Sequence, residues 1–292
     1  ILRQDLNDDE RKTKFKPNKE DSKKTFNKYV ALTKQPFIVY ADTETNTESG
    51  HKLFSYRPYM KHSYDPKLDK HIERCARNVS EIGDYLCDQF MQDITDLRVH
   101  FMRNVNLFPF MNYADKRRWV KTHPEPSACE WCSRPEPLMI HHDHNKSTDN
   151  IVAWVCNKCN QLEAENNKKF SIVFHNLAYD LLTIITSLGK KKFIIEGVER
   201  IIDNNYSLIA KTSMKYSTLK IERVKIGEEQ VTYSDPKKIY TKHLILPDVN
   251  FIDSYAFVPM ALATIINNMR KDVPKDKQKT LFPNTFNYIK GK

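Results

Sequence analysis

The sequence predicts an α/β (α+β) protein built from layers of strands and helices. Three patterns support this class: short hydrophobic runs followed by acidic residues, one long apolar stripe at helical spacing, and alternating segments typical of strands. Of the 292 residues, 40% are hydrophobic and 11% are aromatic, which is enough to bury a core. No hydrophobic run reaches the length that a membrane span needs.

The amino-terminal part of the chain predicts an arm, a strand and a helix, in that order. Residues 1–35 are charged and polar, with lysines spaced among Asp and Asn, and predict a flexible basic arm or linker. The hydrophobic run at 37–40 predicts a buried strand. Between Ser80 and Phe101 apolar residues recur at steps of three and four, which predicts an amphipathic helix whose stripe faces the core.

The carboxyl-terminal part predicts a strand, a helix and then a hairpin. The run at 170–174 predicts a second buried strand, and the apolar run at 181–188 predicts a buried helix. Residues 219–226 alternate in polarity and are followed by Gly227, so we expect a hairpin turn at this glycine. The sheet is expected to continue through 244–246.

Acidic residues follow both buried runs. Asp42 and Glu44 come after the first run, and Asp180 comes shortly after the second. Carboxylates held at the exit of a buried strand suit two hard cations that bridge a phosphodiester oxygen. This pattern indicates nucleic-acid cleavage, although Asp and Glu after a strand are also common as turn or helix-cap residues.

Both acidic segments resemble a known family. Asp42-Thr43-Glu44 and the segment 176–180 resemble the first and second exonuclease motifs of protein-primed family B DNA polymerases of the phage, adenovirus and Maverick/Polinton type. The resemblance implies a ribonuclease-H-like fold and a 3′-to-5′ proofreading exonuclease. In that family the positions of Asp42, Glu44 and Asp180 ligate two Mg²⁺ or Mn²⁺ ions.

The resemblance also implies two contacts to DNA within the second motif. Asn176 and Tyr179 match the residues that hold the single-stranded primer end in this family. A side-chain amide can donate to phosphate or sugar, and an aromatic ring offers a stacking face that tolerates any base. Taken by itself, Tyr179 could equally be a core aromatic.

The resemblance spans roughly residues 36–288 and departs from the family in several places. Segment 251–258 resembles the strand that follows the second motif, and Ala261-Leu262 stands where the family has a Ser-Leu or Thr-Leu pair that touches single-stranded DNA or the primer protein. Tyr288 is followed by no carboxylate, so the third exonuclease motif is missing, and no stretch resembles the polymerase palm. We therefore expect a fragment of a polymerase that stops before the third motif.

A metal-binding pattern lies between the two exonuclease motifs. Two Cys-x-x-Cys pairs, 23 residues apart, predict a structural zinc site; the four thiols are those of Cys129, Cys132, Cys156 and Cys159. Paired disulfides are the alternative, but six cysteines in 292 residues and the absence of a signal peptide favour a reducing compartment. Cys75 and Cys87 are expected to be ordinary thiols.

The segment between the two cysteine pairs resembles the endonuclease VII type of HNH motif. His142 matches the base that deprotonates water in that family, and Asn160 matches one of two residues that hold a magnesium ion. The other magnesium ligand is an Asp, and His141 stands in its place. Imidazole is a poor partner for magnesium, and Asp143 follows His142 where the family's Asp precedes it. The alternative without catalysis is a ribbon stabilised by zinc, whose histidines donate hydrogen bonds to the zinc ligands or contact DNA.

Composition agrees with a nucleic-acid partner. Lys and Arg number 47 against 37 Asp and Glu, a net charge of +10, which favours a polyanion although many proteins carry such charge as a solvated face. The expected partners are single-stranded and primer-terminus DNA, with a terminal priming protein as a further candidate and no membrane. The expected location is intracellular rather than secreted: the nucleus for an integrated element, and otherwise a cytoplasmic viral replication site.

The sequence therefore predicts four regions and leaves three functions open. The regions are the arm at 1–35, a first exonuclease part with a helical region at 36–125, the zinc-binding HNH-like insert at 126–162, and a second, truncated exonuclease part at 163–292. The leading hypothesis is the proofreading region of a protein-primed DNA-directed DNA polymerase. The alternatives are an endonuclease VII-like HNH nuclease and an inactive, zinc-containing DNA-binding relic of a mobile element.

Overall fold

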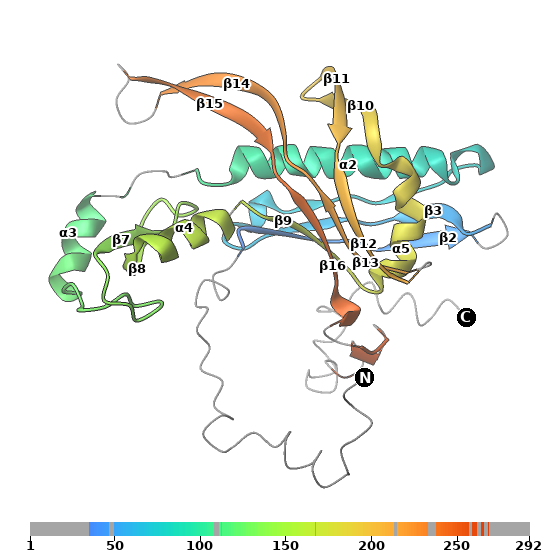
Figure 1. Cartoon of the computed structure of the whole chain (residues 1–292). Helices are drawn as coiled ribbons and strands as arrows, with labels where there is room; N and C mark the ends of the chain where they lie inside the picture. The colour runs from blue at the N-terminus through green and yellow to red at the C-terminus, as the bar shows by residue number, and fades with distance from the viewer. Residues whose placement is uncertain are drawn as a thin grey trace, which may run out of the picture. The chain divides into compact units, whose positions relative to one another are not determined.

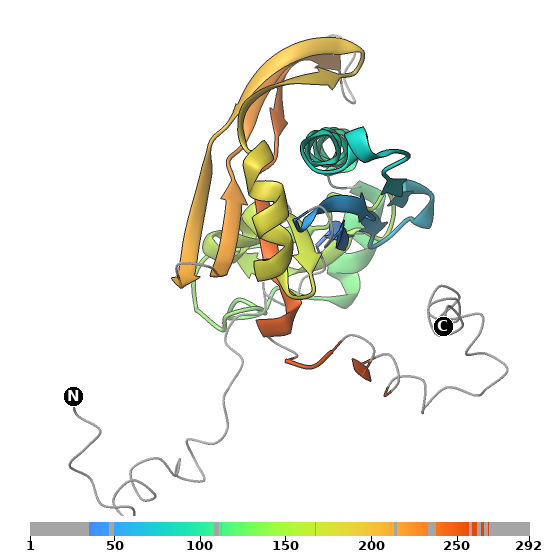
Figure 2. The ribbon, with the colours of Figure 1, turned by 90° about the vertical axis from the view of Figure 1, so that its right-hand side faces the viewer.

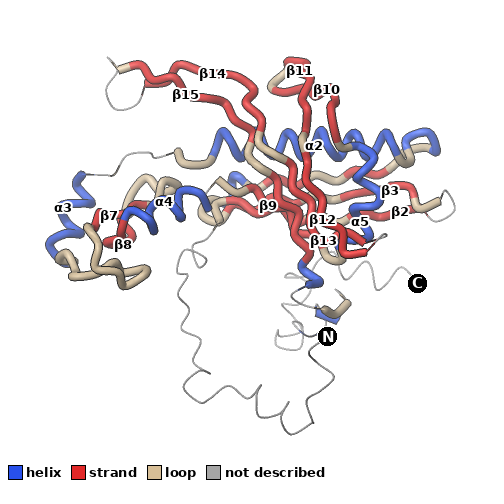
Figure 3. Tube along the Cα trace, viewed as in Figure 1, coloured by secondary structure: helices blue, strands red, loops and turns tan. Residues whose placement is uncertain are grey.

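A computed structural model describes residues 35–46, 50–107, 111, 113–166, 168–212, 215–232, 238–256, 259–261, 264, 265 and 268. Helices and strands are mixed along this part of the chain, which confirms the α+β class (Figures 1 and 3). Contacts divide the described residues into two compact units. The sheet unit comprises 35–109, 144–146 and 165–268, and the cysteine unit comprises 110–143 and 147–164. The predicted arm lies outside the described residues apart from Gln35.

A seven-stranded mixed sheet forms the centre of the sheet unit, in the order β12–β13–β16–β9–β1–β4–β5. These strands are β1 (Phe37–Tyr40), β4 (Tyr59–His62), β5 (Lys70–His71), β9 (Phe170–Phe174), β12 (Tyr206–Thr212), β13 (Lys215–Ile221) and β16 (Val249–Asp253). β9 pairs in parallel with β1 on one side and with β16 on the other, while β4 and β13 pair antiparallel outside them. The carboxyl ends of β1, β9 and β16 therefore meet at one edge of the sheet.

Two helices complete the core of the sheet unit. α2 (Asp84–Asn104) carries the predicted apolar stripe and buries Leu86, Phe90 and Ile94 among other residues. It begins later than Ser80 because Gly83, at φ +90°, interrupts the helical backbone, and a short 3₁₀ turn, η3 (Val79–Glu81), precedes it. α5 (Leu177–Ile184) follows β9 and continues into the 3₁₀ turn η4 (Ile185–Ser187), so the α-helix begins and ends four residues earlier than the predicted 181–188.

Three smaller sheets complete the strand structure of the described part of the sheet unit. They are the hairpins β10 (Gly189–Ile195) with β11 (Val198–Asn204) and β14 (Val224–Thr232) with β15 (Ile239–Leu246), and a three-stranded sheet of β2 (Thr43–Asn46), β3 (Lys52–Tyr56) and β6 (Arg74–Cys75). The predicted turn at Gly227 is wrong: the residue lies inside β14 at a shift in register opposite Leu244, so the chain passes through it as a bulge. Figure 2 views α2 nearly end-on, with the hairpin strands curving past it.

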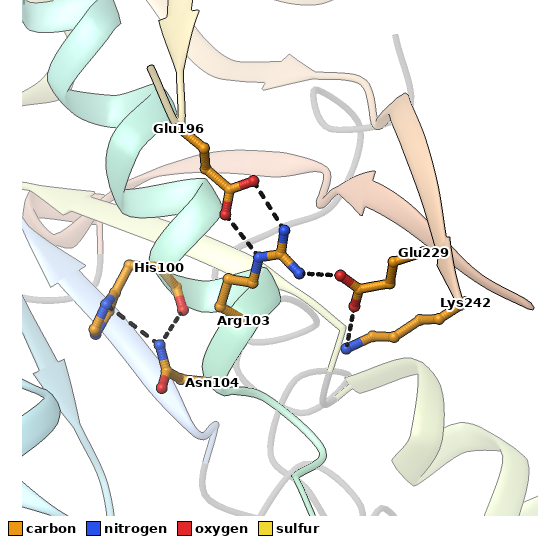
Figure 4. Close-up of polar contacts among 6 residues, drawn as sticks. All are labelled: His100, Arg103, Asn104, Glu196, Glu229 and Lys242. Atoms are coloured by element: carbon orange, nitrogen blue, oxygen red, sulfur yellow. Dashed lines mark hydrogen bonds and ion pairs between the residues drawn. The ribbon is translucent and has the colours of Figure 1, made fainter. Parts of the chain in front are cut away.

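Arg103, near the end of α2, joins both hairpins (Figure 4). Its Nε and Nη2 each donate to Glu196 at 2.8 Å, and its Nη1 donates to Glu229 of β14 at 2.6 Å. Glu196 and Gly197 form the two-residue turn between β10 and β11, and both have positive φ. This is the backbone that a tight hairpin turn requires, and it aims the Glu196 carboxylate at the helix.

The cysteine unit is built from two helices and one hairpin. Its elements are α3 (Tyr113–Thr122), β7 (Leu138–His142), β8 (Ile151–Cys156) and α4 (Asn157–Asn166), whose last two residues belong to the sheet unit. β7 and β8 pair antiparallel, and a small cluster of Val155, Ala153 and the cysteines forms the core of the unit. None of the helices in the described part of the chain is both long enough and apolar enough to cross a membrane.

Candidate functional site

The predicted acidic residues gather at the carboxyl edge of the parallel strands. Asp42 follows β1 after one intervening residue, and Glu44 is the second residue of β2. Asp180 lies in the first turn of α5, the helix that follows β9 after a two-residue loop. Ligand sites in open α/β sheets lie outside the carboxyl ends of the strands. The hydrogen bond from the Thr43 hydroxyl to Asp180 joins the first segment to the second across this edge.

The charges at this edge influence one another. Burial, together with the nearby Asp42 charge, raises the pKa of Asp180 to about 7, against the opposing effect of the Thr43 hydroxyl. Loss of hydration, followed by the Asp42 charge, raises the pKa of Glu44. Loss of hydration raises the pKa of Asp42 above its usual range, even though the residue is exposed. The Thr43 amide and the nearby Arg57 and His175 side chains act in the opposite direction. Asp42 is therefore the common electrostatic neighbour of the other two carboxylates.

The carboxylates are neighbours without being closely packed. The carboxylate oxygens of Asp42, Glu44 and Asp180 do not all lie within 4.8 Å of one another. Among the described residues, the four cysteines form a group of potential metal ligands that meets this distance. Oxygen ligands of this kind suit Mg²⁺ or Mn²⁺, which would offset the charge on all three.

Tyr179 lies at the surface beside the acidic residues. It is 42% exposed, so it is not a core aromatic. Its hydroxyl lies 2.6 Å from Oγ1 of Thr45 and 3.3 Å from Nδ1 of His51. These two contacts fix the ring at the mouth of the site, where an aromatic face can stack on a base.

Asn176 shapes the turn between β9 and α5. It has left-handed backbone angles, φ 73° and ψ 48°, which Asn tolerates better than most residues. Its backbone N–H donates to Oδ1 of Asp253 at 3.0 Å, and the N–H of Tyr255 donates to the same oxygen at 3.0 Å. The Asn176 side chain is exposed and makes no capping hydrogen bond to the helix.

Sequence reasoning missed two side chains that support this edge. Asp253 ends β16 and accepts the two amide hydrogen bonds just described. His175 begins the loop after β9, with Nδ1 3.0 Å from Oγ of Ser254 and Nε2 2.9 Å from the carbonyl oxygen of Met260. The position of Asp253 at the end of a hydrophobic strand was the available signal for it. Leu262, the predicted DNA contact, lies outside the described residues.

The four predicted zinc ligands come together in the cysteine unit. The sulfur atoms of Cys129, Cys132, Cys156 and Cys159 all lie within 4.8 Å of one another. None forms a disulfide, so the disulfide alternative is wrong for these residues. Sγ of Cys132 lies 3.7 Å from Sγ of Cys156. A tetrahedral zinc ion with Zn–S bonds of about 2.3 Å would space sulfurs about 3.8 Å apart, so the set fits a structural metal such as zinc.

The thiols differ in how readily they ionise. Burial alone would raise the pKa of Cys129, but amide N–H groups of Cys156, Trp131 and Cys132 point at its sulfur and lower that pKa to about 7. Burial and the other thiols raise the pKa of Cys159. A bound cation would favour the thiolate at each position, because metal binding displaces the thiol protons.

The HNH-like residues form a hydrogen-bonded cluster in the same unit. His141 is buried, and its Nδ1–H donates to Oδ1 of Asn160 at 2.7 Å, while its Nε2 lies 3.5 Å from Oε2 of Glu163. Burial lowers the pKa of His141 despite the opposing effects of Asn160 and Asp143, which favours the neutral ring. The oxygen of Asn160 that would hold magnesium is thus already bound to His141. Glu163 was not predicted, because only the fold brings it to this ring.

His142 and Asp143 end the first strand of this hairpin. His142 is the last residue of β7, and Asp143 is buried. The N–H of Asp143 donates to the carbonyl oxygen of Asn150 at 2.7 Å, which closes the loop between β7 and β8. The cluster around His141 is therefore organised by hydrogen bonds between protein groups.

No protein-family model, curated protein or solved structure matches the chain.

Proposed function

We propose that the sheet unit is the 3′-to-5′ exonuclease region of a protein-primed DNA-directed DNA polymerase. The observation that carries this proposal is the meeting of Asp42, Glu44 and Asp180 beside the exposed Tyr179 at the carboxyl edge of β1 and β9. Their order along the chain follows the first and second exonuclease motifs of the family. The strand order β5–β4–β1–β9–β16 supports the ribonuclease-H-like fold that the resemblance implies.

Each residue has a distinct role in the proposed reaction. Asp42, Glu44 and Asp180 would hold two Mg²⁺ or Mn²⁺ ions, which supply Lewis-acid activation of the attacking water and stabilisation of the leaving 3′ oxygen. The Thr43 hydroxyl fixes the orientation of Asp180. Tyr179 would stack on the terminal base, and Asn176 would bind its phosphate or sugar.

The substrate of such a site is the single-stranded end of a primer. An exposed ring next to carboxylates accepts an unpaired base more readily than a stacked duplex end, since every base offers a π-face. A terminal priming protein is a second proposed partner. In this setting the chain would act where the element replicates, in the host nucleus or at a cytoplasmic viral replication site.

Digestion of a 3′-labelled, mismatched single strand tests the proposal. We expect stepwise trimming that requires Mg²⁺ or Mn²⁺ and falls by about a hundredfold or more in Asp42→Asn and Asp180→Asn, because each change removes a charge that holds the cations. Asp203→Asn, an exposed change in β11, is the matched control.

The outcome that would overturn the proposal is trimming that persists in both carboxylate variants. Absence of trimming in the unaltered chain, and in a chain extended to include a third exonuclease motif, would also overturn it and would favour an inactive DNA-binding relic. The endonuclease VII-like alternative predicts nicking of circular or branched DNA that His142→Ala abolishes. The hydrogen bond between His141 and Asn160 disfavours that alternative.

A further inference from the structure

Helix α3 of the cysteine unit presents a row of cations on its outer face. Arg117 and Lys121 are exposed and lie four residues apart, and Lys116 adjoins them. No carboxylate among the described residues forms an ion pair with any of these three side chains. The opposite face of the helix carries Asp115, which is buried.

The buried face of α3 is held firmly within its own unit. Oδ2 of Asp115 accepts the N–H of Asp149 at 3.0 Å, and Asp115 also pairs with Arg118. The rings of Trp119 and Trp154 lie 5.9 Å apart, and Nε1–H of Trp154 donates to the carbonyl oxygen of His123 at 3.0 Å. These contacts fix the rotation of the helix, so the cationic row faces outward.

Two apolar side chains interrupt the cations on the same face. Tyr113 is 78% exposed and lies one helical turn before Arg117, and Val120 is 38% exposed between Arg117 and Lys121. Exposing an aromatic ring to water is unfavourable, so a purely solvated helix face would not be expected to carry Tyr113. Cations that alternate with an aromatic side chain are the composition of surfaces that bind single-stranded nucleic acid, in which phosphates meet the cations and a base stacks on the ring.

We propose that this face of α3 binds a single strand of nucleic acid. Lys116, Arg117 and Lys121 would contact successive phosphates, and Tyr113 would stack on one base. The surface uses no residue of the carboxylate site, so it is a separate contact that goes beyond the proposed exonuclease. Charge complementarity selects the polyanion, and the exposed ring favours a single strand over a duplex, whose bases are already stacked.

Binding measured at several salt concentrations tests the cations. The probe is a fluorescent oligo-thymidine, and all proteins carry Asp42→Asn so that the oligonucleotide stays intact. Arg117→Gln with Lys121→Gln should weaken binding and reduce the slope of log K against log salt by about 1.4, because each lost phosphate contact contributes about 0.7 for a single strand. The matched control is Lys190→Gln with Lys192→Gln in β10, which removes the same charge from the sheet unit.

Tyr113→Ala tests the stacking contact separately. We expect a loss of about tenfold in affinity with an unchanged salt slope, since the ring contributes stacking and no charge. Zinc content and tryptophan emission equal to those of the parent would show that the unit remains folded.

Two results would overturn the inference. One is an α3 double variant that matches the Lys190/Lys192 control in both affinity and salt slope. The other is a poly-glutamate chain that binds as tightly as the oligonucleotide and loses the same affinity in Tyr113→Ala. Because the binding assay uses the Asp42→Asn background, failure of the exonuclease proposal would leave these results interpretable.

Discussion

The pKa of the His100 side chain depends on its burial against the core. His100 lies on α2, and its Nε2–H donates to the carbonyl oxygen of Leu68 at 2.9 Å. Its Nδ1 accepts from Asn104 at 3.3 Å (Figure 4). Burial lowers the pKa of His100, against the opposing effect of the Leu68 carbonyl. The folded protein therefore prefers the neutral ring, whose acceptor nitrogen Asn104 already uses.

This preference predicts a pH-dependent stability. As the pH falls below about 6.5, the unfolded chain takes up a proton at this position that the folded chain resists, so stability present above that pH is lost below it. His100→Gln keeps a donor for Leu68 without a titratable group. Urea unfolding should show that the free energy of unfolding of the parent is lower at pH 5.5 than at pH 7.5. In His100→Gln this difference should be smaller, by about 1 kcal/mol or less.

His71→Gln is the control for this measurement, because His71 lies exposed on the edge strand β5. It should leave the pH dependence of unfolding as it is in the parent. An equal pH dependence in the parent and in His100→Gln would contradict the prediction.

Site residues could be predicted from the sequence where they follow the end of a hydrophobic run. Asp42 and Asp180 could be placed together because each follows a strand that reads as buried. His175, Asp253 and Glu163 could not be assigned roles, because their partners lie far away along the chain and are chosen by strand pairing and helix packing. Tyr179 illustrates the same limit, since only the fold decides whether an aromatic ring is buried.

Among elements, helical periodicity predicted structure more reliably than glycine as a turn signal. The stripe between Ser80 and Phe101 became α2, although Gly83 moved its start. The turn expected at Gly227 was wrong because glycine serves both in tight turns and in bulges, and the local sequence does not distinguish the two. The hairpin turn at Glu196 and Gly197 went unnoticed, and it gives the first hairpin its link to α2.

The link through Arg103 predicts coupled motion of the two hairpins. Arg103→Met removes the paired hydrogen bonds to Glu196 and the bond to Glu229, so amide exchange around Glu196 in the first hairpin and around Glu229 in the second should become faster. The free energy of unfolding should fall by only about 1 kcal/mol or less, because the three side chains are partly exposed. Hydrogen exchange followed by mass spectrometry measures both hairpins at once.

Lys192→Met is the matched control for this prediction. It breaks the ion pair with Glu199, which lies within the first hairpin and does not reach α2. Faster exchange in both hairpins of this control would contradict a specific role for Arg103.

At the scale of the whole molecule, the two units differ in what stabilises them. The sheet unit has a large apolar core that includes Phe37, Phe90 and Phe251, whereas the buried cluster of the cysteine unit consists mainly of its cysteines with Ala153 and Val155. A unit with so small a core depends on a metal or another cross-link. The class of the fold and the four-cysteine set could be predicted from sequence, whereas the membership of α3 in this unit depends on contacts that the sequence does not reveal.

Metal removal should therefore affect one unit selectively. All three tryptophans, Trp119, Trp131 and Trp154, lie in the cysteine unit, so tryptophan emission reports on that unit alone. A zinc chelator or Cys132→Ser should shift this emission to the red as the unit unfolds, while the strand signal in far-ultraviolet circular dichroism largely persists. Cys75→Ser, in the sheet unit, is the control and should change neither signal.

Unchanged tryptophan emission after chelation would contradict a structural metal. A parallel collapse of the strand signal would instead show that the two units unfold together.

The parallel pairing of β1 with β9 has a consequence for how the chain folds. β1 ends at Tyr40 and β9 begins at Phe170, and the cysteine unit is synthesised between them. Joining the two strands closes a long loop, whose entropy cost falls when part of that loop has already condensed around its metal. That cost grows by only about 0.6 kcal/mol for each doubling of loop length, so the saving affects the rate of closure more than the final stability. During synthesis, the supply of zinc would then set how quickly the two strands that carry the first and second motifs find each other.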